Sequence, residues 1–418
     1  MAKFIGNHAK HVSDITPDPV YNMHSHYERN LFNKKYFGII AGNAVDQPYG
    51  SIEVVEMSPN GTIDRIANQK KNRLIRLTVE EAVTAVQDIR FSDDMEYGIF
   101  LNVGITGTDF DHGIRFLKRL EDSDGTTYYT ELTAPVGSLS LIDFCDISPD
   151  GTFAVGRSGT TPYLEFYSRS GDTWSVLNAV SGSSITSPVV EGRPKIFHAD
   201  NTAYVANNLN TTTPLFTALR YDSGANSFVV QSTTGITPNT RSTGLGFVDN
   251  TFFVSVIGAN PYIRCFSSSN GFDFTEGTVT GTPAVPHYAP VVSPCGRYVF
   301  ITGNSNTYPY IVYKRNGNDL EYLTDAFDVL PSTSSYTRVF GISWTPDSRY
   351  VFIAAASGSP LVEYYGCRVY ERKGDNFYLI TTPSGYLNNG VPLLGDITFN
   401  QGGQSIYNLT WFKEGWKP

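Results

Sequence analysis

The feature that most constrains this chain is a polar turn between two apolar runs, which recurs along most of its length. The copy at residues 146–155 reads DISPDGTFAV, two strand-like runs joined by a Pro-Asp-Gly turn. Related stretches begin at Arg90, Ile196, Gly246, Val291, Ile342 and Ile397. Their spacing of roughly fifty residues is typical of a repeat architecture, so each period is expected to form one structural unit.

Each period also contains a second hairpin. Residues 306–323 read NTYPYIVYKRNGNDLEYL: a Pro-Tyr pair, an alternating apolar run, an Asn-Gly turn and a second run. Asn-Gly between two such runs is a strong hairpin signal, and proline is best tolerated where a strand begins. Four antiparallel strands per period with almost no helix predict an all-β chain, a β-propeller of four-stranded antiparallel blades.

Seven sets of strands can be counted. They start near Tyr36, Tyr97, Phe153, Tyr204, Phe252, Tyr298 and Tyr350. The first set has no strand of its own upstream, and the last repeat, from Gly395, has only its first two strands. We therefore predict a seven-bladed β-propeller closed by the C-terminal strand joining the N-terminal blade. Eight blades are the alternative, because QSIYNLTWF at residues 404–412 could be a further strand.

This count divides the chain into an N-terminal arm (1–34), the β-propeller (35–410) and a C-terminal tail (411–418). The arm contains no copy of the repeat, and four of the seven histidines lie in it. A segment without a core of its own gains order by docking on a neighbour. We expect the arm and the tail to be the segments through which the chain binds its partners.

Composition and charge narrow the possible functions. The net charge is −9 and the one basic cluster is NQKKNRLIR at residues 68–76, so we expect no nucleic-acid partner. No apolar run has the length of a signal peptide core or a membrane span, so we expect no membrane insertion. The four cysteines are widely spaced and form no metal-binding pair, and no cofactor motif is present, so no cofactor is expected.

The aromatic residue after each proline is the candidate for ligand binding. Tyr49, Tyr163, Tyr262 and Tyr310 precede the third strand of their periods, and Asn43 and Asn304 stand in the same loops. Such rings can stack on sugars, but packing against the neighbouring blade is the simpler interpretation.

We predict no metal site and no catalytic residue. The segment TDFDHG places Asp109, Asp111 and His112 together, the residue types that a cation or an acid–base reaction needs, yet a plain turn explains them as well. GxSxG, HExxH and phosphate-binding glycine loops are all missing from the sequence.

The repeat resembles the degenerate seven-bladed propellers of the WD40-like class, with which it shares the SPDG turn, although Gly-His and Trp-Asp pairs are missing. The abundance of Thr, Ser, Asn, Gly and Tyr with little Lys and Met is similar to structural proteins of tailed-bacteriophage virions. That resemblance implies a non-enzymatic virion structural protein, a propeller platform on the tail or capsid surface, located in the virion. Its expected partners are other virion subunits, bound through the N-terminal arm and the C-terminal tail, with a host-surface glycan as the further candidate. The alternative is a propeller with a ligand face, a glycan-binding module or a polysaccharide or lactone hydrolase or lyase.

Replacing Tyr49, Tyr163, Tyr262 and Tyr310 one at a time by alanine separates the two interpretations of these rings. If they pack between blades, each change lowers the Tm by removing buried aromatic surface and leaves ligand binding unaffected. Lost glycan binding by a protein with an unchanged Tm would contradict the packing interpretation. Thermal denaturation and a glycan-binding screen are the two measurements.

Overall fold

The computed structural model describes 20 separate stretches of the chain, which contain β-strands and the turns between them. They are residues 36–42, 52–57, 63–65, 75–76, 86–102, 113–123, 127–136, 142–158, 163–181, 194–197, 202–206, 215–236, 241–257, 260–281, 283, 287–303, 310–328, 338–356, 366–380 and 406–411. Over these residues the protein is all-β, and no helix of this part is long and apolar enough to cross a membrane. The predicted arm and nearly all of the tail lie outside the described residues.

The strands of the described residues form seven sheets, numbered here from the N-terminus. From inner to outer strand, sheet 1 contains β31 (Ile406–Trp411), β1 (Tyr36–Gly42), β2 (Ile52–Met57) and β3 (Ile63–Arg65). Sheet 2 contains β5 (Val86–Phe91), β6 (Tyr97–Asn102), β7 (Gly113–Glu121), β8 (Thr127–Leu132) and β4 (Ile75–Arg76). Sheet 3 contains β9 (Ile142–Ile147), β10 (Phe153–Ser158), β11 (Leu164–Ser170) and β12 (Thr173–Val176).

The other four sheets follow the same plan. Sheet 4 contains β14 (Pro194–Phe197), β15 (Thr202–Ala206), β16 (Phe216–Asp222), β17 (Ser227–Val230) and β13 (Asn178–Ser181). Sheet 5 contains β18 (Arg241–Val248), β19 (Thr251–Ile257), β20 (Ile263–Ser267) and β21 (Thr275–Glu276). Sheet 6 contains β23 (His287–Val292), β24 (Tyr298–Gly303), β25 (Tyr310–Asn316), β26 (Asp319–Tyr322) and β22 (Val279–Thr280), and sheet 7 contains β27 (Arg338–Trp344), β28 (Tyr350–Ala356), β29 (Gly366–Lys373) and β30 (Asn376–Leu379).

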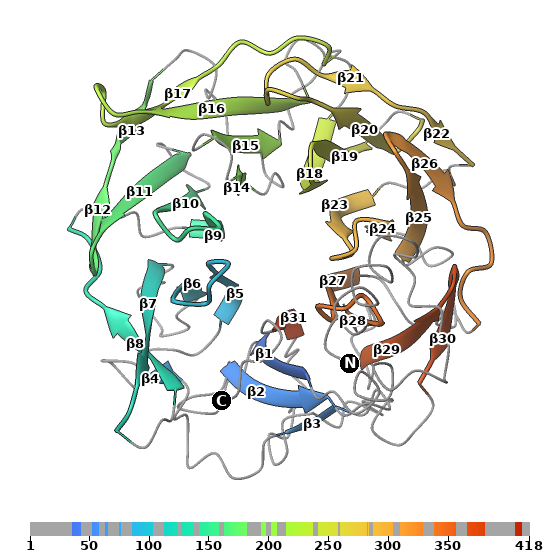
Figure 1. Cartoon of the computed structure of the whole chain (residues 1–418), viewed down its shortest axis with the longest axis horizontal. Helices are drawn as coiled ribbons and strands as arrows, with labels where there is room; N and C mark the ends of the chain where they lie inside the picture. Colours follow the sequence, from blue (N-terminus) through green and yellow to red (C-terminus); the bar gives the residue numbers. More distant parts are fainter. Residues whose placement is uncertain are drawn as a thin grey trace, which may run out of the picture.

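The sheets are arranged about a common axis (Figure 1). The strands nearest to this axis are β31, β5, β9, β14, β18, β23 and β27. Neighbouring sheets contact one another near the axis, for example β9 with β14, β14 with β18 and β27 with β31. The last strand, β31, pairs antiparallel with β1, so the two ends of the described chain meet in sheet 1. The architecture is therefore propeller-like, as the sequence predicts.

The recurring polar turn joins the first two strands of a sheet and has a common structure. In sheet 3 the Ser148 hydroxyl donates to Asp150 over 2.6 Å and accepts the amide of Phe153 over 2.9 Å. The residue after the aspartate, Gly151, has a φ of +67°, a left-handed conformation that glycine adopts without a steric penalty. Ser92 and Thr345 make the same two kinds of bond in sheets 2 and 7. This turn explains the repeated sequence, because it reverses the chain while satisfying its own backbone groups.

Apolar side chains fill the spaces between sheets. Between sheets 2 and 3, Phe116 stacks on Trp174 with ring centroids 4.6 Å apart, and both are almost fully buried. Between sheets 6 and 7, Phe300 and Trp344 meet edge to face. Ring pairs of this kind contribute about 0.5–1.5 kcal/mol each beyond the area that they bury. Apolar clusters of this kind lie at each boundary from sheet 2 to sheet 7, so both faces of sheets 3, 4, 5 and 6 are covered.

One aspect of the predicted blade is corrected by the structure. The prediction of four antiparallel strands fits sheets 1, 3, 5 and 7, whereas sheets 2, 4 and 6 have a fifth strand. That strand pairs in parallel and follows the outermost strand of the preceding sheet, as β13 does with β17. The sequence analysis missed these strands because β4 and β22 are only two residues long and lack an alternating pattern.

Gly277→Ala tests the close approach between sheets 5 and 6. A Cβ atom at Gly277 would lie 1.7 Å from the carbonyl oxygen of Asn318, a backbone atom that cannot move aside cheaply. We expect a loss of about 2–3 kcal/mol, seen as a fall in Tm. The control is Gly317→Ala, at a φ of +60° with open space around it, which should cost only about 1–2 kcal/mol of backbone strain. Equal falls in Tm would contradict the proposed close approach.

Candidate functional site

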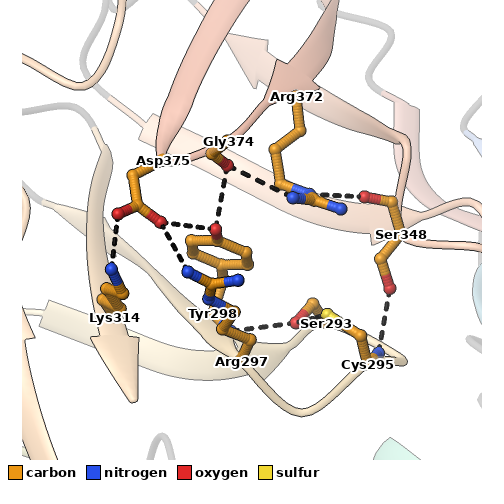
Figure 2. A network of polar contacts seen from close by, with 9 residues as sticks. All are labelled: Ser293, Cys295, Arg297, Tyr298, Lys314, Ser348, Arg372, Gly374 and Asp375. Atoms are coloured by element: carbon orange, nitrogen blue, oxygen red, sulfur yellow. Dashed lines mark hydrogen bonds and ion pairs between the residues drawn. The ribbon is translucent and has the colours of Figure 1, made fainter. Parts of the chain in front are cut away.

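The polar network in Figure 2 lies where the turns of sheets 6 and 7 meet. Asp375 accepts hydrogen bonds from the Tyr298 hydroxyl at 2.6 Å and from Lys314 at 2.5 Å, and Arg297 lies 3.4 Å away. The Tyr298 hydroxyl also reaches the carbonyl oxygen of Gly374 at 2.8 Å. The network therefore joins the second and third strands of sheet 6 to the outer turn of sheet 7.

The electrostatics of the network stabilise the ionised form of Asp375. Partial burial alone would raise the pKa of Asp375, but the hydrogen bonds from Lys314 and Tyr298 outweigh it and hold this pKa below its usual value. Burial, together with the neighbouring carboxylate, raises the pKa of Tyr298, so its hydroxyl remains a donor. A carboxylate fixed in this way is a structural acceptor and a weak base.

The same arrangement recurs between sheets 2 and 3. There the Tyr97 hydroxyl donates to Asp172 at 3.0 Å, Lys118 forms an ion pair with Asp172 at 2.6 Å, and Arg169 lies 3.5 Å from the centre of the Tyr97 ring. Tyr204 likewise donates to the carbonyl oxygen of Gly271 between sheets 4 and 5. Because a reacting centre is seldom repeated around one fold, we assign these networks to the joining of sheets.

A second polar cluster lies on the inner edges of sheets 3 and 4. Asp146 on β9 accepts the backbone amide of Ile196 on β14 at 2.9 Å through Oδ2. Its other oxygen, Oδ1, lies 3.5 Å from Nζ of Lys195. Both side chains keep some exposure, 10% for Asp146 and 24% for Lys195, although they stand on the strands nearest the axis. The carboxylate of Asp146 and the ammonium group of Lys195 thus face each other near the axis, and both are partly exposed to solvent.

Two further residues complete this inner cluster, which consists of Phe144, Asp146, Arg157 and Lys195. Phe144 lies two residues before Asp146 and therefore on the same side of β9. Arg157 pairs with Phe144 in the strand register, and its guanidinium lies 5.3 Å from the centre of the Phe144 ring. Arg157 is buried, with 4% of its surface exposed. The inner cluster thus combines two cations, a carboxylate and an aromatic ring.

The chemistry available to the inner cluster is acid–base and electrostatic. The 3.5 Å separation of Asp146 and Lys195 is that of an ion pair and is longer than a good hydrogen bond. Among the described residues no group of three His, Cys, Asp or Glu side chains is placed to hold a metal ion.

The structure describes only some of the residues that the sequence analysis predicted to bind a ligand. Tyr310 begins β25 with 3% of its surface exposed, packed in the core between sheets 6 and 7 and in contact with Tyr370. Tyr163 and Tyr262 precede β11 and β20 and are half-buried. Tyr49, Asn43, Asn304, Asp109, Asp111 and His112 lie outside the described residues. The ligand role of all these residues stays a prediction.

The sequence analysis missed the inner cluster, although one signal was present. The strand IDFCDI at residues 142–147 is the innermost strand of its sheet, yet it contains two aspartates. A charged residue in an inner strand is costly to bury without a partner, and that partner, Lys195, is supplied by the next repeat. Only the juxtaposition of two repeats brings them together.

Comparison with known proteins gives a likeness of fold. No family model and no curated protein matches the sequence. Among solved structures, the chain is similar to the periplasmic gluconolactonase PpgL of Pseudomonas aeruginosa, with a TM-score of 0.58, 13% identity, and 91% of this chain and 99% of that one covered. It is also similar to a candidate 6-phosphogluconolactonase of Bacteroides fragilis, with a TM-score of 0.58, 12% identity, and 91% and 98% covered. At such identities the likeness shows the propeller fold alone.

These matches correct the main functional prediction. The sequence analysis expected a non-enzymatic virion structural protein, whereas both similar structures described above carry the names of lactone-hydrolysing enzymes and neither that of a virion protein. The predictions that the chain is not an enzyme and that it resides in a virion lose their support for the same reason. Composition misled here, because abundant Thr, Ser, Asn, Gly and Tyr serve the turns and strands of any propeller. The names of these two structures agree better with the alternative, a propeller with a ligand face acting as a glycan-binding module or as a polysaccharide or lactone hydrolase or lyase.

Asp375→Asn tests the network of Figure 2 through its pH dependence. The change removes the charge that pairs with Lys314 and Arg297, and we expect a loss of about 1 kcal/mol at pH 7, because the ion pairs are partly exposed. Since the folded pKa of Asp375 is lowered, its contribution is fully present above 3.8, the usual value, and is lost as the pH falls through the folded pKa.

The measurement is the Tm of the wild type and the variant from pH 7 downwards, and the difference should shrink below pH 3.8. Asp222→Asn is the control, because Asp222 accepts only exposed backbone amides of its own turn in the bonds seen here. A Tm difference for Asp375→Asn that is independent of pH would contradict the electrostatic explanation.

Proposed function

We propose that this chain is a propeller-fold lactone hydrolase whose reacting pair is Asp146 and Lys195. The observation that carries the proposal is the placement of this pair on two adjacent inner strands, with Oδ1 of the carboxylate facing the ammonium group. The likeness of fold to structures named as lactonases supports the same class of reaction. The substrate class is a cyclic ester small enough to reach the inner strands.

Each group of the pair has one role in the proposed reaction. Asp146, oriented by the Ile196 amide at Oδ2, takes a proton from a water molecule through Oδ1 as that water attacks the ester carbonyl carbon. Lys195 stabilises the negative charge that develops on the carbonyl oxygen. When the intermediate collapses, the ring C–O bond breaks and the leaving oxygen receives the proton from Asp146. One lactone and one water give one hydroxy acid, and Asp146 ends as the carboxylate with which it began.

Arg157 and Phe144 serve binding in this proposal. The guanidinium of Arg157 lies on the same side of sheet 3 as Asp146 and adds positive potential near the carboxylate end of the product. The Phe144 ring, which the guanidinium overlies, supplies apolar surface against which a sugar-like ring can lie.

We also propose that the seven sheets form a seven-bladed ring closed by β31. The antiparallel pairing of β31 with β1 and the contacts of β31 with β5 and β27 support closure. In a ring of this kind each sheet has a neighbouring sheet on both faces, and its innermost strand is a short edge strand that faces the axis. The ring also fixes the distance between β9 and β14, on which the reacting pair depends.

Asp146→Asn is the test of the proposed reaction. The amide keeps an acceptor for the Ile196 N–H, so we expect the fold to persist, whereas general-base catalysis should fall by about 10²-fold or more. The assay measures hydrolysis of glucono-δ-lactone above its spontaneous rate, with Tm and circular dichroism as checks of folding.

Asp222→Asn, in an exposed turn of sheet 4, is the matched control and should keep the wild-type rate. Lys195→Met should lower kcat more than it raises KM, since the ammonium acts on charge that develops in the transition state. A wild type without any rate above background on glucono-δ-lactone and on simple γ- and δ-lactones would rule the proposal out.

A further inference from the structure

Two Asn-Gly pairs lie in turns of the described structure, at residues 270–271 and 316–317. Asparagine is a thermolabile residue, because the backbone nitrogen of the next residue can attack its side-chain amide. Glycine in that next position has no side chain to hinder the attack. Hydrogen bonds in the folded protein decide how freely the attacking nitrogen and the amide can move, and the two pairs differ in these bonds.

The pair in sheet 5 is held by hydrogen bonds at both reacting groups. Oδ1 of Asn270 accepts the amides of Phe272 at 2.9 Å and Asp273 at 2.8 Å. Nδ2 of Asn270 donates to Asp273 at 2.6 Å, and the Gly271 amide donates to the Ser268 hydroxyl at 2.9 Å. Attack of the Gly271 nitrogen on the Asn270 amide therefore requires several of these bonds to break first.

The pair in sheet 6 is open by comparison. Asn316 ends β25, Gly317 follows it in the two-residue turn before β26, and both residues are exposed. In the described part of the chain, neither the Asn316 side chain nor the Gly317 amide makes a hydrogen bond. A Cβ atom at Gly317 would have no other atom within 4 Å, so the turn has room for a ring to close.

The same turn is part of a joint between sheets 5 and 6. Nε of Arg315 donates to the Gly317 carbonyl oxygen at 2.7 Å, and Nη2 donates to the Thr251 hydroxyl of sheet 5 at 2.8 Å. Nη1 lies 3.4 Å from Oδ2 of Asp249, which also belongs to sheet 5. One arginine therefore connects the outer turn of sheet 6 to the first turn of the neighbouring sheet.

We propose that Asn316 is a self-modification site, at which deamidation loosens the joint that Arg315 makes between sheets 5 and 6. The Gly317 nitrogen attacks Cγ of Asn316, the new N–C bond closes a succinimide ring, and the Cγ–Nδ2 bond breaks. Ammonia leaves with the proton of the Gly317 amide. Water then opens the ring and gives an aspartyl or an isoaspartyl residue. The inference goes beyond the proposed hydrolase and does not depend on it.

The isoaspartyl product changes the geometry of the turn. Its main chain contains one extra CH2 group, which the two-residue connection between residues 316 and 319 does not accommodate. The Gly317 carbonyl follows this insertion directly and moves away from Arg315. The product also places a carboxylate beside the same guanidinium, where it competes with Asp249. Both effects weaken the contact with sheet 5.

The rate of deamidation is the first test. The full-length native protein is aged in a mildly alkaline buffer, and peptide mapping by mass spectrometry follows each site. Each rate is divided by that of the same site in urea-unfolded protein, which removes differences in intrinsic reactivity. We expect Asn316 to react at least about tenfold faster than Asn270, because breaking the hydrogen bonds of the second pair adds to its barrier.

Ser268→Ala is the matched variant for this comparison. It removes the acceptor of the Gly271 amide, so deamidation of Asn270 should become faster while that of Asn316 stays unchanged. Equal normalised rates at the two sites of the wild type would overturn the proposed site.

The effect on the joint is tested by the Tm before and after ageing. Asn316→Gln keeps an exposed amide, but its attack would have to close a six-membered ring, which is far slower. We expect ageing to lower the Tm of the wild type and to leave that of Asn316→Gln almost unchanged, although the variant retains every other Asn-Gly pair. Arg315→Met has already lost the joint and should lose less Tm on ageing than the wild type. Falls of equal size in the wild type and in either variant would overturn the link between deamidation and the joint.

Discussion

In the described part of the chain, sheets 3 to 6 depend on their neighbours to cover both of their faces. A four-stranded sheet with Phe, Tyr and Trp on both sides would expose large apolar areas if it stood alone, and burial of such area is the main favourable contribution to folding. In the described residues the apolar clusters lie between sheets, as with Phe116 and Trp174, and not within one. The propeller-like arrangement is therefore a consequence of two-faced sheets that pack on each other in series.

This mutual covering decides where polar groups can be placed. The hydroxyl–aspartate turns and the tyrosine–aspartate networks lie at the ends of the sheets, where solvent lowers the cost of charge. Asp146 and Lys195 are different, because they stand on inner strands and form an ion pair across a sheet boundary. A charged pair on the inner strands of the fold is the feature from which a function is most reasonably argued.

The sequence by itself determined the all-β class, the period, the order of strands and the turns. These depend on local physics: the left-handed residue after Asp150, the Ser148 hydroxyl that closes its turn, and the alternation of apolar residues along strands such as β10. Composition does not specify which residues meet in space, and the functional prediction drawn from it was of the wrong class. Only the tertiary structure decided which residues of different repeats meet. Asp146 and Lys195 are 49 residues apart, and the parallel strand β13 is defined by a partner in the next sheet. Such contacts arise from packing between sheets, and no local pattern in the chain encodes them.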